Sequence, residues 1–164
     1  MKIQGQSFGA HLRLVRPFLW FIAAVWLLRL TLPAFSPPAW IISLFSVHLA
    51  VSISVLVVVV LIFWRQFGSY ANVVFSTFLL VAWGELLVSA AILFAVMTGI
   101  ENIFIYPEFS LANDPYHLKH VIGHLTFSLG GGTLVGSAMG CLLFYLLGSF
   151  FPGHSQAREE GPAG

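Results

Sequence analysis

The segment "VSISVLVVVVLIFW", residues 51–64, decides the fold of this chain, because its only polar residues are two serines. It completes an apolar run that begins at Ala39. An apolar helix of about 20 residues crosses the ~30 Å hydrocarbon core of a bilayer, and few charged groups interrupt such a helix. We therefore predict a transmembrane helix over residues 39–64.

The composition of the whole chain agrees with this prediction. The 164 residues are 59% hydrophobic and only 8% charged, whereas about a quarter of the residues in soluble domains are charged. A soluble domain of this size keeps too much surface to bury so many apolar side chains. The formal net charge of +1 gives no polyanion-binding surface, so we expect no nucleic-acid partner. The lipid bilayer is the expected surrounding.

Three further stretches are apolar enough to span a membrane, and the last of them belongs to a longer helix. Asp114 and Pro115 suit the N-cap and first position of a helix, so the fourth helix is expected to start near residue 115. The fold class we predict is an all-α four-helix transmembrane bundle with a long glycine-lined fourth helix. The expected parts are an N-terminal segment 1–16, spans 17–32, 39–64, 73–100 and 121–151 within a domain 17–151, and a disordered tail 152–164.

Basic residues in short flanks set the predicted orientation. In a four-span arrangement one side carries Lys2, Arg13, Arg16, Arg65 and Arg158, and the other side carries Lys119. Because positive flanking residues stay on the cytoplasmic side, both termini are expected to be cytoplasmic. We expect a multi-pass protein of the bacterial inner (plasma) membrane.

Four ionisable residues, Arg29, His48, Glu85 and His124, fall inside the apolar spans, where such groups are costly and tend to mark functional sites. Glu85, near the middle of the third span, is a candidate catalytic or proton-exchanging carboxylate or metal ligand; the alternative is a neutral, hydrogen-bonded carboxyl group. His48, inside the second span, is either a cofactor ligand or a core histidine. Arg29 either extends toward the headgroups or pairs with a carboxylate such as Glu85.

The stretch "HLKHVIGH", residues 117–124, is the candidate metal site. His117, His120 and His124 share one face of a helix at these spacings. With Glu101 and Asp114 as oxygen donors they would suit a transition metal such as zinc, iron, copper or manganese. The alternative is a polar cluster in the headgroup layer.

Small residues recur every fourth position in the last span, at Ser128, Gly132, Gly136 and Gly140. This small-xxx-small pattern is typical of close helix packing, either within the chain, in self-association or with other membrane subunits. The alternative is a groove for a flat ligand or a lipid tail.

Three functions remain open. The leading hypothesis is an accessory or electron-transfer-type membrane subunit. Its site, formed by His48, Glu85, His120 and His124, would bind a transition metal or haem b, with His48 and His124 as the axial pair. The second is an intramembrane metalloenzyme acting on a lipid-like substrate, with Glu85 as general base. The third is a purely structural subunit of a larger complex.

Overall fold

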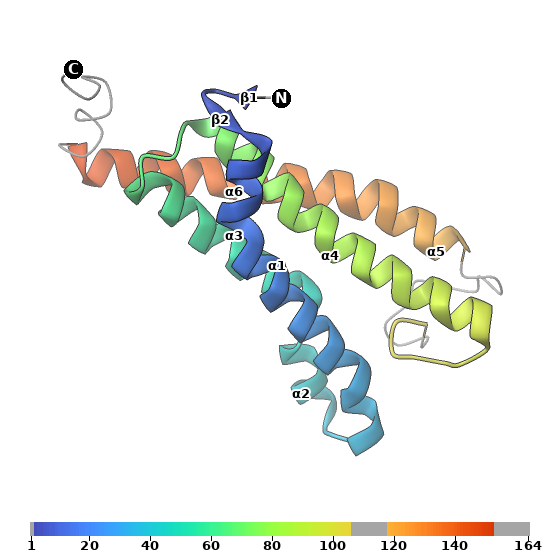
Figure 1. Cartoon of the computed structure of the whole chain (residues 1–164). Helices are drawn as coiled ribbons and strands as arrows, with labels where there is room; N and C mark the ends of the chain where they lie inside the picture. Colours follow the sequence, from blue (N-terminus) through green and yellow to red (C-terminus); the bar gives the residue numbers. More distant parts are fainter. Residues whose placement is uncertain (1, 106–117, 153–164) are drawn as a thin grey trace.

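The computed structural model describes residues 2–105 and 118–152, and these residues are almost entirely helical (Figure 1). A short antiparallel hairpin precedes the helices. The elements, in chain order, are β1 Lys2–Ile3, β2 Gln6–Ser7, α1 Phe8–Thr31, the 3₁₀ turn η1 Leu32–Phe35, α2 Ala39–Leu44, α3 Val47–Trp64, α4 Tyr70–Thr98, α5 Leu118–Gly123, the π turn η2 His124–Ser128, and α6 Leu129–Phe150.

Within residues 2–105 and 118–152, four helical segments are long and apolar enough to cross a membrane, as predicted. They cover residues 8–35, 40–64, 70–98 and 118–150. Since α1 and α4 run opposite to α3 and α6, the bundle has two distinct ends. At the histidine end, α1 and α4 finish while α3 and α5 begin; at the hairpin end lie β1, β2 and the last turn of α6.

The first helix starts earlier than the predicted span. We expected Pro17 near a helix start, but α1 begins at Phe8 and contains Pro17 in its interior. Ser7 is the N-cap, and its hydroxyl accepts a hydrogen bond from the backbone N–H of Ala10 at 3.2 Å. The capped start offsets the one backbone hydrogen bond that an interior proline removes. Residues 8–16 are therefore helical and belong to the bundle.

The second predicted span is two helices rather than one. Phe45 and Ser46 leave the helical conformation between α2 and α3. Arg29 lies at this break, where its Nη1 donates to the carbonyls of Ile42 and Phe45, each at 3.3 Å. Carbonyls at a helix end lack intrahelical partners, so Arg29 supplies donors for them. The Arg29 guanidinium lies 5.8 Å from the centre of the Phe104 ring.

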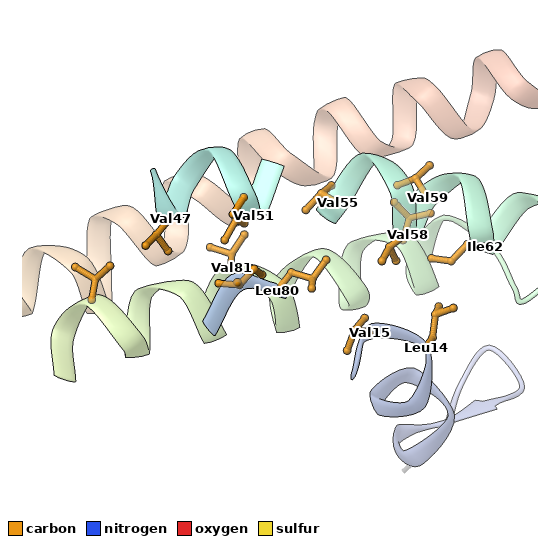
Figure 2. Close-up of a cluster of buried hydrophobic side chains, with 14 of the residues drawn as sticks. Leu14, Val15, Val47, Val51, Val55, Val58, Val59, Ile62, Leu80 and Val81 are labelled. Carbon is orange, nitrogen blue, oxygen red and sulfur yellow. The ribbon is translucent and has the colours of Figure 1, made fainter. Parts of the chain in front are cut away.

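The core lies along one face of α3 that packs on α4 and α1. Figure 2 shows this stripe, whose side chains follow helical spacing: Val47, Val51, Val55, Val58, Val59 and Ile62. They meet Leu80 and Val81 of α4, and Leu14 and Val15 of α1. Half of the α4 span is buried, against 6% for the first span and 11% for the last. Helix α4 is thus the centre of the bundle, and α1 and α6 present wide apolar faces outward.

The small residues of α6 pack against α4 of the same chain. A Cβ added at Gly132, Gly136 or Gly140 would lie 3.1 Å from Val81, 2.9 Å from Thr77 or 3.0 Å from Val73, respectively. Such distances leave no room for a larger residue, so the glycines allow the two backbones to approach closely. The three glycines therefore support the hypothesis of close helix packing, here between α6 and α4 of one chain.

Candidate metal centre

Four ionisable side chains meet near the histidine end of the bundle, and three separate helical segments contribute them. His48 lies in the first turn of α3, Glu85 near the middle of α4, and His120 and His124 in α5 and at the start of η2. Because α4 runs antiparallel to the other two segments, its middle lies beside their beginnings.

The carboxylate of Glu85 bridges two histidines. Its Oε2 lies 2.6 Å from His124 Nδ1, and its Oε1 lies 3.2 Å from His48 Nε2. The Glu85 side chain is only 5% exposed. A buried carboxylate is costly unless its oxygens are bonded, and these two ring nitrogens supply a partner for each oxygen.

His120 extends the cluster beyond Glu85. His120 Nε2 lies 3.1 Å from His124 Nε2. When both rings are neutral, one of these nitrogens donates and the other accepts. If His124 Nδ1–H donates to Glu85, then His124 Nε2 accepts from His120. The hydrogen bonds thus run in one direction, from His120 through His124 to Glu85.

A π turn carries His124 into this arrangement. The backbone N–H of Leu129 bonds to the carbonyl of His124, five residues earlier, instead of four. Single π turns inside α-helices are rare and occur frequently at functional sites. The wider turn changes the angle between the histidines before it and the packed glycines after it, so both sets can face α4.

Two cavities meet at His48, the most accessible member of the cluster. Its side chain is 63% exposed, against 12% for His124. A cavity of about 310 Å³ runs between α3, α4 and α6 and reaches His48 and Glu85. On the histidine-end side, a chamber of about 100 Å³ is lined by Arg29, His48, His120 and His124, among other residues. The cluster therefore lies between an apolar groove and a smaller polar chamber.

The structure brings only some of the predicted metal ligands together. Within residues 2–105 and 118–152, the one group of three potential ligands whose donor atoms all lie within 4.8 Å of one another is His48, Glu85 and His124. Glu101 lines a different cavity, together with Trp26 and Asn102. His117 and Asp114, the predicted helix start near residue 115, and the tail from residue 153 lie outside the described residues.

The predicted axial pair for a haem, His48 and His124, is joined through the carboxylate of Glu85. Their ring centres are 6.2 Å apart with planes 21° from parallel, and the carboxylate of Glu85 bridges their nitrogens. A porphyrin would have to displace this buried carboxylate. A single ion that takes Glu85 as a ligand needs no such displacement.

A second polar cluster, at the hairpin end, had no sequence signal that we recognised. His11 of α1 is fully buried; its Nδ1 donates to the Ser7 carbonyl at 3.0 Å, and Asn72 of α4 lies 2.9 Å from its Nε2. With the Asn72 amide nitrogen facing His11, that amide also donates to the Ile3 carbonyl and accepts from the Ser69 N–H. The spacing from Ser7 to His11 is visible in the sequence, but the pairing with Asn72 depends on the fold.

Comparisons with known proteins add no identification: no protein family, curated protein or solved structure matches this chain. The chemistry of its own residues is what indicates a function.

Proposed function

We propose that this chain is an integral membrane protein that binds one transition-metal ion through His48, Glu85 and His124. The observation that carries the proposal is the proximity of three potential ligand atoms, all within 4.8 Å of one another, on separate helical segments of an otherwise apolar bundle. Ionisable residues inside membrane spans are expensive and tend to be functional. A shared metal ion would use all three.

The donor set narrows the class of ion. Two imidazoles and one carboxylate suit zinc or divalent iron, cobalt or manganese, whereas Mg²⁺ and Ca²⁺ prefer oxygen ligands alone. Copper(I) prefers thiolate or thioether ligands, and the single cysteine, Cys141, is not a member of the ligand group. Zinc is therefore the first ion to test.

Binding requires the ring nitrogens that donate to Glu85 to lose their protons, and it requires a modest change in the contact distances. At metal–ligand distances of ~2.1 Å, neighbouring ligands of a tetrahedral ion lie about 3.4 Å apart. The 3.2 Å between Glu85 Oε1 and His48 Nε2 is already close to this value. The 2.6 Å hydrogen bond between Glu85 and His124 must open by about 0.8 Å.

His120 would act on the ion through His124. A histidine that binds a metal is commonly held by a hydrogen bond from outside the ligand set, and loss of such a partner weakens metal binding about 10–100-fold. The contact of His120 with His124 fits this role. Three protein ligands leave a fourth position open, as in catalytic rather than purely structural zinc sites.

The finer topology is part of the proposal. Lys2, Arg13, Arg16 and Arg65 all belong to the hairpin end, which supports cytoplasmic termini and a metal centre in the outer half of the membrane. The wide apolar faces of α1 and α6 would contact lipid or, in an accessory subunit, partner helices. The bacterial inner membrane remains our expectation for the location.

The test is metal analysis of the full chain purified in detergent without added chelator and then titrated with Zn²⁺. Wild type should bind one ion per chain. The double variant His48→Ala/His124→Ala and the single variant Glu85→Gln should lose stoichiometric binding, because each removes donor atoms from the group of three.

Glu101→Gln is the matched control for Glu85→Gln. It removes an exposed carboxylate on the same side of the bundle but outside the ligand group, so it should bind zinc as wild type does. If Glu101→Gln loses the ion while Glu85→Gln keeps it, the ligand set is wrong. A wild-type chain that folds but binds no ion overturns the proposal.

A further inference from the structure

The apolar groove beside the metal centre has the shape and chemistry of a site for a membrane amphiphile. It is lined by α3, α4 and α6, and its volume of about 310 Å³ is at the lower end of the range for small-molecule sites. Empty apolar cavities of about 150 Å³ already admit a benzene molecule. The groove therefore has room for a hydrocarbon segment.

The polar groups of the groove are concentrated at one end. His48 and Glu85 are there, and the residues farther along α3 and α6 include Val55, Leu56 and Met139. Ser52 also lines the groove, but its hydroxyl donates to the His48 carbonyl at 2.9 Å, so its donor is already used. The side chains along the length of the groove are mostly apolar, so they suit a hydrocarbon chain better than a polar ligand.

The direction of the groove matches that of a lipid in the same leaflet. Along α3 it extends from His48 to Leu56, about 12 Å at 1.5 Å per residue, away from the histidine end and into the bundle. A bound amphiphile would thus place its head at the metal centre and its tail toward the middle of the membrane. Leu56, Val135 and Met139 on the groove are exposed, so the tail can enter sideways from the hydrocarbon layer.

We propose that this groove binds the hydrocarbon tail of a single-chain amphiphile whose oxygen-donor head takes the open position on the metal ion held by His48, Glu85 and His124. This inference rests on the proposed metal site and names the ligand class of that site. The head is a carboxylate, phosphate or similar oxygen donor, because the ion supplies positive charge next to Glu85. A water-soluble ligand would make no use of the groove.

The experiment uses Co²⁺ in place of zinc, because the visible spectrum of Co²⁺ reports its ligands. The full chain in detergent is loaded with Co²⁺ and titrated with dodecyl hydroxamate, which joins a metal-binding head to a long tail, and with acetohydroxamate, which has the same head and no tail. Wild type should bind the long-tailed probe more tightly than the short one, and both probes should change the Co²⁺ spectrum.

Two matched variants on α3 separate the groove from general partitioning into detergent. Leu56→Trp fills the groove, whereas Ile53→Trp puts the same indole on an exposed position of α3 that does not line it. Leu56→Trp should lose the preference for the long tail while keeping Co²⁺ and its response to acetohydroxamate. Ile53→Trp should behave as wild type.

The possible failures are distinguishable. No Co²⁺ spectrum in wild type defeats the metal site itself, and this inference with it. Normal Co²⁺ binding with equal tail preference in Leu56→Trp and Ile53→Trp overturns the amphiphile site alone. If Leu56→Trp instead changes the oligomeric state while Ile53→Trp does not, the groove is a helix-packing surface and the amphiphile proposal fails.

Discussion

His11 and His48 are both histidines of apolar membrane-type helices, but their surroundings differ in every respect that matters for chemistry. His11 is fully buried, bonded to a backbone carbonyl and a neutral amide, and enclosed by the edges of Phe67 and Phe75. His48 is 63% exposed on its side chain, contacts a carboxylate, and borders two cavities. A polar group in an apolar bundle is structural when neutral partners saturate it, and available for binding when a charge and an opening remain.

The comparison predicts that removing His11 has the largest effect on stability. His11→Ala leaves a cavity and a buried Asn72 without its partner, which together should cost about 3 kcal/mol of unfolding free energy. His48→Ala should cost less, about 1–2 kcal/mol, because it leaves Glu85 Oε1 without its partner but removes a mostly exposed side chain and so creates no cavity. Denaturant unfolding of both variants in the same detergent checks this.

For zinc binding, His48→Ala is expected to have a larger effect than His11→Ala. His11→Ala should retain one ion per chain under conditions where it is folded, while His48→Ala should not. Equal zinc loss in both variants would remove the distinction between the two clusters.

Adding zinc should raise the unfolding free energy of the wild-type protein by slightly less than His11→Ala lowers it. Free Zn²⁺ at 100 times the dissociation constant should add about 2.7 kcal/mol, because the ion binds the folded state. Glu85→Gln should show no such increase, whereas Glu101→Gln should show all of it. Thermal unfolding with and without Zn²⁺ measures the difference, and an equal increase in Glu85→Gln would place the ion elsewhere.

Gly68→Ala should weaken the hairpin end only. Gly68 has φ +155°, a conformation that L side chains rarely adopt, and an added Cβ would overlap the Asn72 amide. The strain and the disturbed amide together should cost about 2 kcal/mol. Gly99→Ala is a useful control: Gly99 also has a positive φ, but its Cβ would meet no atom within 4 Å. A larger loss of stability in Gly99→Ala would contradict the proposed importance of Asn72.

The smallest expected effect comes from Arg29, which bonds to the backbone at the break just before α3. Arg29→Met removes the donors to the Ile42 and Phe45 carbonyls and loosens the start of α3, where His48 lies. Zinc affinity should fall about tenfold, as for other residues that support a metal ligand from outside the ligand set. Arg29→Lys should restore part of it, and zinc titration measures both. Unchanged zinc affinity in Arg29→Met would mean that the break between α2 and α3 keeps its geometry without the hydrogen bonds from Arg29.

The sequence predicts the number and type of membrane helices well, because the apolar content of a span is a local property. It also singles out Glu85, His48 and His124 by the cost of ionisable groups in an apolar segment, and His120 by its helical spacing with His124. It does not reveal the break at Phe45, since the neighbouring residues are as apolar as the rest of the span and the carbonyls freed there are bonded by Arg29, from another helix.

The leading hypothesis grouped His48, Glu85, His120 and His124, but tertiary structure decides which of them have donor atoms close enough to share an ion. Helical spacing groups His124 with its sequence neighbours, but Glu85 and His48 join it only because α4 is antiparallel to α3 and α5. The π turn at residues 124–128 is equally invisible in the sequence, because no proline marks it.

A π turn is the form that a one-residue insertion takes within an α-helix, and this has a consequence for how the last helix can vary. Deleting one residue between 125 and 127 would restore ordinary helical winding while Gly132, Gly136 and Gly140 stay seated on α4. The four α-helical steps that would replace the five steps of the π turn wind through nearly the same angle, so the part before the deletion would keep its orientation relative to the glycines. His120 and His124 would still face Glu85, and a chain shortened in this way would keep both its scaffold and its ligands.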